Sequence, residues 1–518
     1  MLFCFPLLGI LAGAAMAVAP VPLVDGNVIR DARTGKEFVP HGVNWPSFEY
    51  ACQQGWGYSN LGASPETAQA MLDWNIDTVR IPLNQDCWLG EDGMPKAALL
   101  GPVPLTSDGY RSAVEEFVTD MTDAGIVAIL DLHWTAPPGY VADGLRPMPD
   151  SRSDELWFSV AERFRANPSV IFDLFNEPHS RWDPNRPKSP PGSGTGSWDF
   201  KLTWEGWVNG GQSATNHADT EYPFTRPRYK TVGMTDLVEA VRSTGATQPI
   251  ILSGLDYAND LSKWDEFAPD DSQLIAGFHN YPGQRCNNET CWTTEVAELS
   301  TQVPVITTEF GQNDCRSNFV RGYMDWADDF HIGYLAWAWW DLELPGGAPS
   351  CTNFALLDDL DGTPTPDYGA AYRQHLVSLP PELPDVKQVP KREPRLRITS
   401  AWFSKGRLHA VIRLDPDATA PVRASVRLKR ERVRGNPARS KRLKVLRFKV
   451  QPVDGVGRFR RVIPRTWVPR VVKAGYPGDE RLLADRSTRR SNLAPERRRQ
   501  SAAGRSWRSE HTLRRAPW

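Results

Sequence analysis

Charged and polar side chains stand at the ends of several apolar runs of this sequence, where packing gives no reason for them. Glu177 follows Asn176 near the end of VIFDLFNEP, and Glu309 stands near the end of PVITTEFG. The residues that end similar runs are Arg80, His133, His279 and Tyr281. Carboxyl groups that meet in one pocket can exchange protons with a substrate or attack it as nucleophiles. For any single carboxylate a surface salt bridge is the ordinary explanation. A catalytic role is therefore predicted only if the fold brings these residues together in one pocket.

Eight short apolar runs alternate with helical patterns in the first three quarters of the chain. They are FVPHGVNW, DTVRIPL, IVAILDLHW, VIFDLFNEP, PIILSG, LIAGFHNY, PVITTEFG and GYLAWAWWD. Runs that are apolar throughout are typical of strands covered on both faces, and alternating βα units of this number predict an α/β fold, a (β/α)8 TIM barrel. A doubly wound sheet is the alternative, although no glycine-rich phosphate loop follows the first run. In a barrel the carboxyl ends of the strands share one pocket, which would gather the polar residues.

The helical patterns carry their own start and stop signals. Val114, Phe117, Val118 and Met121 recur at helix spacing, and Gly125 supplies a stop before the next strand. Ser64-Pro65 has the form of an N-cap followed by proline at the first helical position.

The charge distribution divides the chain in two. Residues 391–518 carry 36 Lys+Arg against 10 Asp+Glu, whereas residues 1–390 carry 24 against 52. We therefore predict a catalytic domain at 21–378, a Pro-rich linker at 379–394 and a small basic β-sandwich-like domain at 395–480, where alternating strand patterns recur. Residues 481–518 are Arg-rich with few apolar side chains, and this composition predicts a disordered tail.

The N-terminus and the cysteines predict an exported protein. Residues 1–20 form an apolar run followed by small residues, as in a signal peptide, although no Lys or Arg precedes the run. A membrane anchor is the alternative, but the run is short for a span, and we expect no span after its removal. Beyond the leader the cysteines are even in number, which favours disulfides and a secreted, extracellular location: Cys52, Cys87, Cys286, Cys291, Cys315 and Cys351.

A set of motifs in a fixed order resembles a known enzyme family over residues 38–375. The motifs are His41-Gly42-Val43-Asn44-Trp45, Thr78-Val79-Arg80-Ile81-Pro82, Leu130-Asp131-Leu132-His133-Trp134, Phe175-Asn176-Glu177-Pro178, His279-Asn280-Tyr281 and Thr308-Glu309-Phe310-Gly311, followed by a Trp-rich eighth strand. They resemble the glycoside hydrolase clan with catalytic glutamates after strands four and seven, and within it family 5, the cellulase family. An NEP tripeptide alone is a modest signal, whereas the ordered set is a strong one.

The resemblance implies a role for each matching residue. Glu177 is expected to be the general acid/base and Glu309 the nucleophile of a retaining hydrolase, which needs carboxyl groups about 5–5.5 Å apart. Arg80 and Tyr281 are expected to keep Glu309 charged and aimed. Asn176 is expected to bind the sugar 2-hydroxyl.

The remaining expected pocket residues are histidines and tryptophans. His133 and His279 are expected to position the catalytic groups or touch the sugar, although a lone histidine is more often structural. The family places a tryptophan of the eighth strand under the sugar. Trp337 and Trp339 share one strand face, and we predict Trp339, unless a bulge hands the role to Trp340. Trp45 is a second candidate, with packing over the barrel mouth as the alternative.

The predicted loops also suggest disulfide pairs. Cys52 and Cys87 follow strands one and two, and Cys315 and Cys351 follow strands seven and eight, so each pair lies on neighbouring loops. Cys286 and Cys291 would close a small loop after strand six.

The segment after the fourth strand, about residues 180–230, is too long for a plain βα loop. It contains Trp182, Trp198, Trp204 and Trp207 among Gly, Pro and Asn. We predict a lid or cleft wall that contributes to substrate binding, with a surface excursion that does not contact sugar as the alternative.

The predicted function is cleavage of internal β-1,4-glucosidic bonds of cellulose or related β-glucans. The same mechanism on mannan, xyloglucan or β-1,3-glucan is one alternative, and a non-catalytic polysaccharide-binding protein is another. No CxxC motif or Cys/His cluster has metal-ligand spacing, so we expect no cofactor and no metal. We expect a monomer, with contact between the basic C-terminal segment and a polyanion as one option and no specific nucleic acid partner.

Overall fold

A computed structural model describes residues 18–61, 64–90, 104–187, 195–216, 227–341, 350–380, 383–387 and seven strands between residues 397 and 490. Side chains are described up to residue 387, except those of 184–187 and 195. The predicted signal peptide therefore lies almost entirely outside the described residues. The chain divides into two compact units, Met1–Val389 and Pro390–Trp518.

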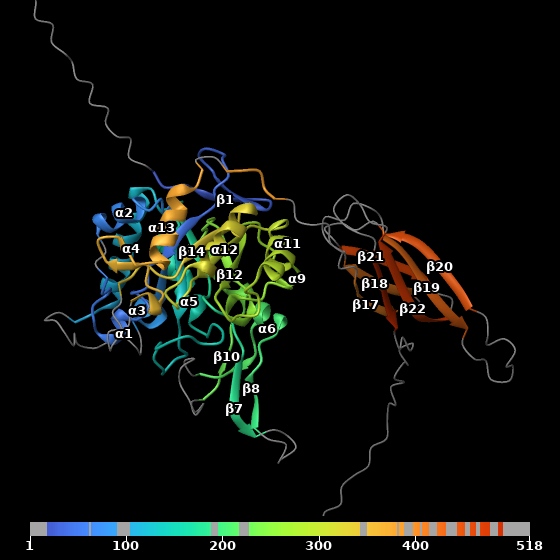
Figure 1. Cartoon of the computed structure of the whole chain (residues 1–518). Helices are drawn as coiled ribbons and strands as arrows, with labels where there is room; N and C mark the ends of the chain where they lie inside the picture. Colours follow the sequence, from blue (N-terminus) through green and yellow to red (C-terminus); the bar gives the residue numbers. More distant parts are fainter. Residues whose placement is uncertain are drawn as a thin grey trace, which may run out of the picture. The chain divides into compact units, whose positions relative to one another are not determined.

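The first unit is built around a closed barrel of parallel strands (Figure 1), in the order β11-β12-β13-β14-β3-β4-β5-β6. The strands are β3 (His41–Asn44), β4 (Thr78–Asn84), β5 (Val127–Trp134), β6 (Val170–Asp173), β11 (Ile250–Ser253), β12 (Leu274–Asn280), β13 (Val305–Phe310) and β14 (Gly333–Ala336). Each comes from one of the eight predicted runs, so the TIM barrel is confirmed.

The interior of the barrel is filled by a cluster of buried valine, isoleucine and leucine side chains. The buried residues of this cluster are Ile29, Val127, Ile129, Ile171, Ile251, Ile275, Ile306 and Leu335. Ile29 belongs to the hairpin of β1 (Pro22–Asp25) and β2 (Val28–Asp31), which lies at one end of the barrel (Figure 1). The apolar plug closes this end, so the pocket must lie at the other.

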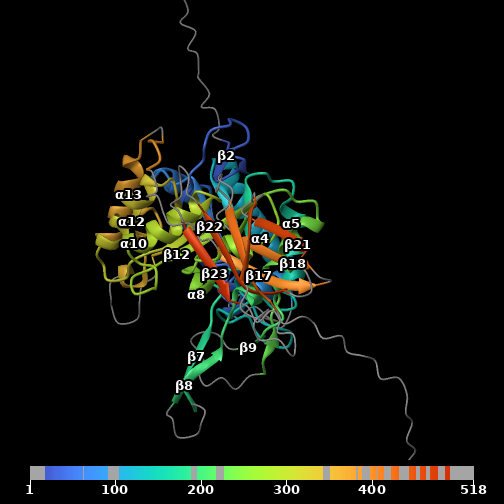
Figure 2. The ribbon, with the colours of Figure 1, turned by 90° about the vertical axis from the view of Figure 1, so that its right-hand side faces the viewer.

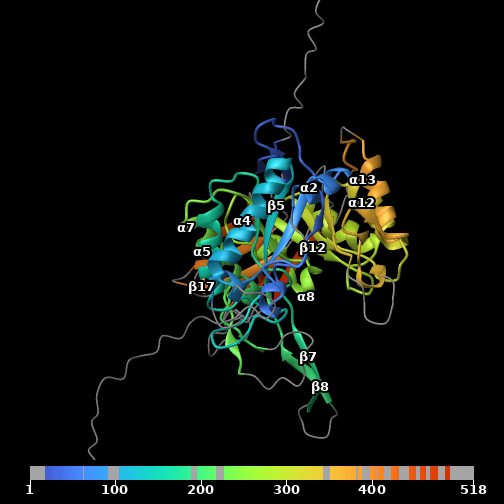
Figure 3. The same cartoon turned by 90° about the vertical axis from the view of Figure 1, so that its left-hand side faces the viewer.

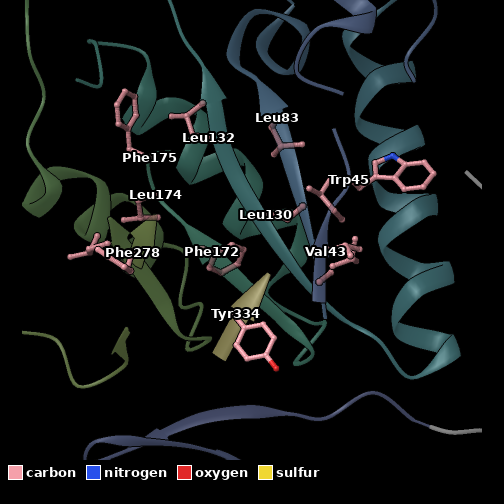
Figure 4. Close-up of a cluster of buried hydrophobic side chains, with 14 of the residues drawn as sticks. Val43, Trp45, Leu83, Leu130, Leu132, Phe172, Leu174, Phe175, Phe278 and Tyr334 are labelled. Carbon is pink, nitrogen blue, oxygen red and sulfur yellow. The ribbon is translucent and has the colours of Figure 1, made fainter. Parts of the chain in front are cut away.

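A second, larger cluster lies between the strands and the outer helices (Figure 4). Trp45 leaves β3 and packs on Phe117 of α4 with ring centroids 4.7 Å apart. At Gly42 the two backbones approach so closely that a Cβ atom would lie 1.8 Å from the Thr78 carbonyl oxygen. Only glycine fits there, and this close approach brings β3 against β4, which carries Arg80.

Helices surround the barrel (Figure 3), with shorter ones in the loops. The longer helices are α2 (Pro65–Leu72), α4 (Ser107–Ala124), α5 (Ser153–Phe164), α7 (Met234–Ser243), α12 (Asn318–Asp329) and α13 (Tyr368–Ser378). The shorter ones are α1 (Ala51–Gln54), α3 (Gln85–Leu89), α6 (Trp204–Asn209), α8 (Leu255–Ala258), α9 (Trp264–Phe267), α10 (Glu289–Cys291), α11 (Ala297–Ser300), the π-helix η1 (Trp292–Val296) and the 3₁₀-helix η2 (Ser350–Asn353). The predicted signals hold: Pro65 begins α2, and Gly125, at φ 102°, ends α4. Among the described residues, no helix combines the length and the apolar character that crossing a membrane requires.

The segment after β6 forms a projecting hairpin and a small sheet. The hairpin joins β7 (Arg181–Pro187) to β8 (Thr195–Phe200) and extends away from the barrel in all three views (Figures 1–3). The other short strands are β9 (Ser213–Ala214), β10 (Tyr229–Lys230), β15 (Leu357–Asp359) and β16 (Thr363–Pro364).

The second unit consists of two antiparallel sheets. One has the order β17-β18-β21, from β17 (Arg397–Ser404), β18 (Arg407–Arg413) and β21 (Val456–Val462). The other has the order β20-β19-β22-β23, from β19 (Val422–Arg430), β20 (Leu443–Val450), β22 (Trp467–Tyr476) and β23 (Asp485–Arg490). The sandwich arrangement stays a prediction. β23 lies in the tail predicted to be disordered and pairs with β22, because backbone pairing at a sheet edge does not require an apolar sequence.

Part of the predicted linker is bound to the barrel. His331 Nε2 lies 2.8 Å from the Pro384 carbonyl oxygen, and the Lys387 backbone donates to the Asp329 carbonyl oxygen at 2.7 Å. Residues 383–387 therefore belong structurally to the first unit, and the division between the units falls at residue 389.

All three predicted disulfides are present: Cys52–Cys87, Cys286–Cys291 and Cys315–Cys351. They close loops of very different length, since their sequence separations are 35, 5 and 36 residues. Cross-linking stabilises a fold by restricting the unfolded chain, and this effect grows with the loop.

We predict that replacing Cys52 and Cys87 together by Ala lowers the free energy of unfolding by roughly 4 kcal/mol, whereas the Cys286→Ala/Cys291→Ala pair costs about 2 kcal/mol. Urea unfolding of the two double variants beside wild type provides the measurement. Equal losses would contradict the chain-entropy explanation and assign the stabilisation to local contacts.

Candidate active site

Seven of the predicted site residues lie on, or just after, five strands of the barrel: β4, β5, β6, β12 and β13. Arg80 lies on β4, His133 on β5, His279 on β12 and Glu309 on β13. The remaining three stand just beyond strand ends: Asn176 and Glu177 after β6, and Tyr281 after β12. All lie at the end of the barrel away from the β1–β2 hairpin, because parallel strands point the same way.

Arg80 is completely buried and organises the site through its guanidinium group. Nη1 donates to Glu309 Oε1 at 2.7 Å and to Asn44 Oδ1 at 3.0 Å, while Nη2 donates to Asn176 Oδ1 at 2.9 Å. Asn44 in turn donates to the Thr308 carbonyl oxygen, next to Glu309. Because the Asn176 oxygen is engaged by Arg80, its amide NH2 group is the part left to face a ligand.

Two buried aspartates, which sequence reasoning missed, also hold Arg80. Nε donates to Asp173 Oδ2 at 2.9 Å, and Nη2 lies 3.0 Å from Asp131 Oδ1. Burial raises the pKa of Asp131 to about 7 and that of Asp173 well above its usual range, although Arg80 opposes both shifts. With Glu309, three carboxyl groups therefore surround one fixed cation. The missed signal was the spacing of Asp131 and His133, which puts both on one face of β5.

Both carboxylate oxygens of Glu309 accept hydrogen bonds that fix its orientation. Oε1 accepts from Arg80, and Oε2 accepts from the Tyr281 hydroxyl at 2.9 Å. Burial raises the pKa of Glu309, while Arg80 and the Tyr281 hydrogen bond act in the opposite direction. A carboxylate oxygen of Glu309 and one of Glu177 lie within 4.8 Å of each other. This pair is therefore close enough to act on one bond from two sides.

His279 connects the two glutamates. Its Nδ1 lies 2.9 Å from Glu177 Oε1 and 3.5 Å from Glu309 Oε2, and its Nε2 lies 3.1 Å from Thr308 Oγ1. Burial, with Arg80 and His133 nearby, lowers its pKa well below the usual value, so the ring is neutral. A neutral ring with Nε2–H toward Thr308 leaves Nδ1 to accept a proton held by Glu177. His133 is positioned separately, with Nδ1 2.6 Å from Asp131 Oδ2.

Two tryptophans predicted to lie under the sugar are buried in the core. Trp339 is 0 % exposed and packs edge-on against Trp74, with ring centroids 5.0 Å apart. Trp45 is also buried, in the contact with Phe117 described above. Neither has a face open to a ligand, so the packing alternative holds for Trp45 and the choice of Trp339 is wrong.

Trp337 is the tryptophan of this segment that is partly exposed. It is half-buried and lies nearly parallel to the His133 ring, at 5.5 Å and 16°. The alternation of strand faces did not apply, because β14 ends at Ala336 before the tryptophans begin. Trp340 is buried and donates from Nε1 to the Asn353 carbonyl oxygen at 3.2 Å.

Two groups of described side chains have the geometry to offer three ligand atoms to a metal. One is Glu177, His279 and Glu309, and the other is Cys286, Cys291 and Glu295. The two cysteines form a disulfide and have no thiolate to offer. In the first group, Glu309 accepts hydrogen bonds from Arg80 and Tyr281, and Glu177 is hydrogen-bonded to His279, an arrangement suited to nucleophilic and acid–base chemistry.

Another carboxyl group near the site is buried, and it forms no ion pair among the described residues. Glu49, in the loop after β3, accepts from the Ser47 backbone N–H at 2.7 Å. Burial raises its pKa to about 8, and the charges of Asp131 and Glu309 add to the shift. Glu49 is therefore a neutral acid at neutral pH.

Comparison with known proteins gives one family match and several similar structures. The family model described as Cellulase (glycosyl hydrolase family 5) matches residues 32–343. A β-glucanase of Saccharophagus degradans has 18 % identity and a TM-score of 0.48, over 70 % of this chain and 94 % of its own. A hyperthermophilic endocellulase of the archaeon Pyrococcus horikoshii has 16 % identity and a TM-score of 0.47, over 70 % of this chain and 100 % of its own. A search of curated proteins found no match.

The hydrogen bond between Tyr281 and Glu309 predicts a change in pH dependence. Tyr281→Phe removes a donor that lowers the Glu309 pKa, so this pKa rises further above its usual value. If ionised Glu309 is required, activity is lost at a higher pH as the solution is acidified. A pH profile of kcat/KM should show the acid limb moved upward; an unmoved limb would contradict the role of Tyr281.

Burial of Glu49 predicts a change in stability with pH. The folded protein keeps this proton up to about pH 8, whereas the unfolded chain releases it near the usual glutamate pKa of 4.5. Stability from this group is therefore present at low pH and lost as pH rises between these values.

Glu49→Gln should reduce the loss of unfolding free energy between pH 5 and pH 8, by on the order of 4 kcal/mol. Urea unfolding at several pH values measures it, with Glu116→Gln on the exposed face of α4 as the control. The same slope in wild type and Glu49→Gln would show that Glu49 does not titrate in this range.

Proposed function

Because the chain belongs to the cellulase family, glycosyl hydrolase family 5, we propose that it cleaves internal β-1,4-glucosidic bonds of cellulose or related β-glucans by double displacement. The match spans both glutamates, and the chain is a glycoside hydrolase of the cellulase type. The observation that carries the finer proposal is the short separation of the Glu177 and Glu309 carboxylates, within 4.8 Å between oxygens.

In the first step, Glu309 attacks the anomeric carbon while Glu177 protonates the departing glycosidic oxygen. The bond from Glu309 to the sugar forms as the bond to the leaving oxygen breaks. Arg80 and Tyr281 hold the two Glu309 oxygens in place, so little reorganisation is needed during the attack. Neutral His279, bonded to Glu177, can support the proton that Glu177 must carry without repelling it.

In the second step, Glu177 takes a proton from water, and the water oxygen attacks the anomeric carbon. Glu309 leaves as a carboxylate, and the product keeps its original configuration. The close spacing supports this route over inversion, since an inverting pair needs about 6.5–9.5 Å to admit a water molecule between nucleophile and sugar.

Two further residues are suited to hold the sugar at the cleavage point. Asn176 is fixed by Arg80 with its NH2 group left as a donor, which suits the sugar 2-hydroxyl. Trp337 offers a half-buried ring beside His133, and flat apolar rings suit the axial C–H faces of β-linked sugars. This position would replace the one predicted for Trp339.

The two glutamates and Arg80 would act equally on mannan, xyloglucan or β-1,3-glucan. The proposal of a β-1,4-glucan substrate is therefore based on the family match. A non-catalytic binding protein is less consistent with this site. Such a protein would have no need for a nucleophile held by Arg80 and Tyr281 opposite a second carboxyl group.

We also propose that the protein is exported. The three disulfides of the described residues support this, because structural disulfides persist in oxidising compartments. The assignment of residues 1–20 as a signal peptide remains a prediction.

Glu309→Gln and Glu177→Ala should separate the two roles. We expect Glu309→Gln to lose activity on carboxymethylcellulose and on dinitrophenyl β-cellobioside alike, since no nucleophile remains. Glu177→Ala should lose about 10²–10⁴-fold on the polymer but form the glycosyl-enzyme normally with the dinitrophenyl substrate, whose leaving group needs no proton. Burst kinetics measure this, and azide should rescue only Glu177→Ala.

A panel of carboxymethylcellulose, β-glucan, mannan and xyloglucan tests the substrate, and proton NMR of the first product tests retention. Activity on mannan alone would keep the mechanism and replace the substrate. An inverted product would contradict double displacement.

A further inference from the structure

An exposed pair of tryptophans lies on the hairpin that follows the general acid. β7 begins at Arg181, four residues after Glu177, and β8 returns to the barrel at Phe200. Figures 2 and 3 show this hairpin beyond the end of the barrel away from β1–β2, on the side where the active site opens. The predicted excursion of residues 180–230 therefore begins as an antiparallel ribbon that starts close to Glu177 in the chain.

The two tryptophans stand side by side on one face of the ribbon. Trp182 and Trp198 are direct cross-strand partners, so their side chains share a face. Their ring centroids are 5.2 Å apart at 85°, and the residues are 48 % and 46 % exposed. Trp204 and Trp207 of the same excursion are buried and anchor it instead. Adjacent exposed indole rings on a projecting ribbon mark a surface that another molecule covers.

The root of the hairpin is held by the rest of the excursion and by the loop after β5. Arg228 Nη1 donates to both carboxylate oxygens of Asp199 at 3.0 Å, and Arg228 Nη2 donates to the Ser213 carbonyl oxygen of β9 at 2.6 Å. Arg181 is buried, with Nη2 donating to the Leu145 carbonyl oxygen at 3.3 Å. Trp182 is five residues from Glu177, so their Cα atoms are at most about 17 Å apart, a length that a few sugar units span, and Trp198 is the cross-strand partner of Trp182.

An aromatic contact occupies the space between Glu177 and the hairpin. His179 stacks on Tyr257 of the loop after β11, with centroids 4.2 Å apart and planes within 9°. The Tyr257 backbone donates to the Pro178 carbonyl oxygen, and Asp256, Tyr257 and Ala258 all have φ between 56° and 59°. Three successive left-handed residues cost roughly 1–2 kcal/mol each, so the surrounding structure must fix this turn. The partly buried Tyr257 ring is thus held against His179, the second residue after Glu177.

We propose that Trp182 and Trp198 form a sugar-binding subsite on the leaving-group side of the cleavage point, for a β-1,4-glucan chain that extends beyond the barrel. The proposal rests on the proposed function. Glu177 protonates the oxygen of the departing half of the chain, so that half passes the segment that follows Glu177. Indole faces suit the flat, uncharged faces of equatorially substituted glucose units, and each ring of an edge-to-face pair can offer a different surface to one chain.

The test compares short and long substrates. Trp182→Ala/Trp198→Ala should lower kcat/KM on cellohexaose by about tenfold, from the loss of roughly 1.4 kcal/mol of stacking. It should leave kcat/KM on dinitrophenyl β-cellobioside unchanged, because that leaving group is too short to reach the hairpin. Phe158→Ala, at a side chain 45 % exposed on α5, is the matched control and should change neither value.

A cross-strand tryptophan pair could instead serve only to stabilise the hairpin. Trp198→Leu separates the two roles, since leucine keeps apolar contact but has no flat face. We expect it to keep the wild-type melting temperature and still lose activity on cellohexaose. Equal losses on short and long substrates, or no loss on either, would overturn the proposal.

A binding measurement on a variant that does not hydrolyse the substrate tests the Trp182/Trp198 subsite independently of catalysis. In a Glu309→Gln background, affinity electrophoresis through gels containing carboxymethylcellulose should show retardation that the tryptophan substitutions weaken. If the wild-type enzyme hydrolysed no β-glucan but the retardation depended on Trp182 and Trp198, the proposed function and the leaving-group assignment would fail, and only glucan binding by the two tryptophans would stand. If hydrolysis occurred and retardation did not depend on them, the subsite alone would fail.

Discussion

The site depends on one buried cation. Arg80 has no solvent contact, yet its guanidinium group touches Glu309, Asn176, Asp173 and Asp131. A buried guanidinium is tolerated only when its donors are matched by acceptors, and buried carboxylates only when a cation or protons neutralise them. Glu309, the amide of Asn176 and the two inner aspartates are therefore held by the same side chain, and removing Arg80 would leave the buried carboxyl groups without their cation.

The barrel supplies the geometry that this unit needs. β4, β5 and β6 are neighbours, and β13 lies across the barrel mouth from them, so a side chain of Arg80's length can reach all three partner strands. The other end of the barrel is filled by Ile29 and the aliphatic layer above it. Apolar and charged side chains are thus separated along the barrel axis. Apolar packing stabilises one end of the barrel, and this stability holds the charged side chains in place at the other end.

The loops extend the site outward in different ways. Cys52–Cys87 joins the loops after β3 and β4, and Cys315–Cys351 joins those after β13 and β14, so covalent bonds hold the rim on these sides. After β6 there is no disulfide among the described residues, and the Asp199–Arg228 ion pair with buried Trp204 and Trp207 anchors the excursion instead. This leaves Trp182 and Trp198 exposed on a ribbon whose root is fixed.

The sequence by itself determined the eight strands, the barrel, the disulfide pairs and the residues Glu177, Glu309, Arg80, His279 and Tyr281. Uninterrupted apolar runs and polar strand ends are local patterns, and parallel strands bring their ends together in any barrel. Tertiary structure decided what depends on contacts between distant elements. It buried Trp339 against Trp74 and left Trp337 beside His133, because the strand ended before the tryptophans and alternation no longer applied. It also made Asp131 and Asp173 partners of Arg80. The role of a buried carboxylate in an apolar strand can be assigned only when the cation that it contacts is known.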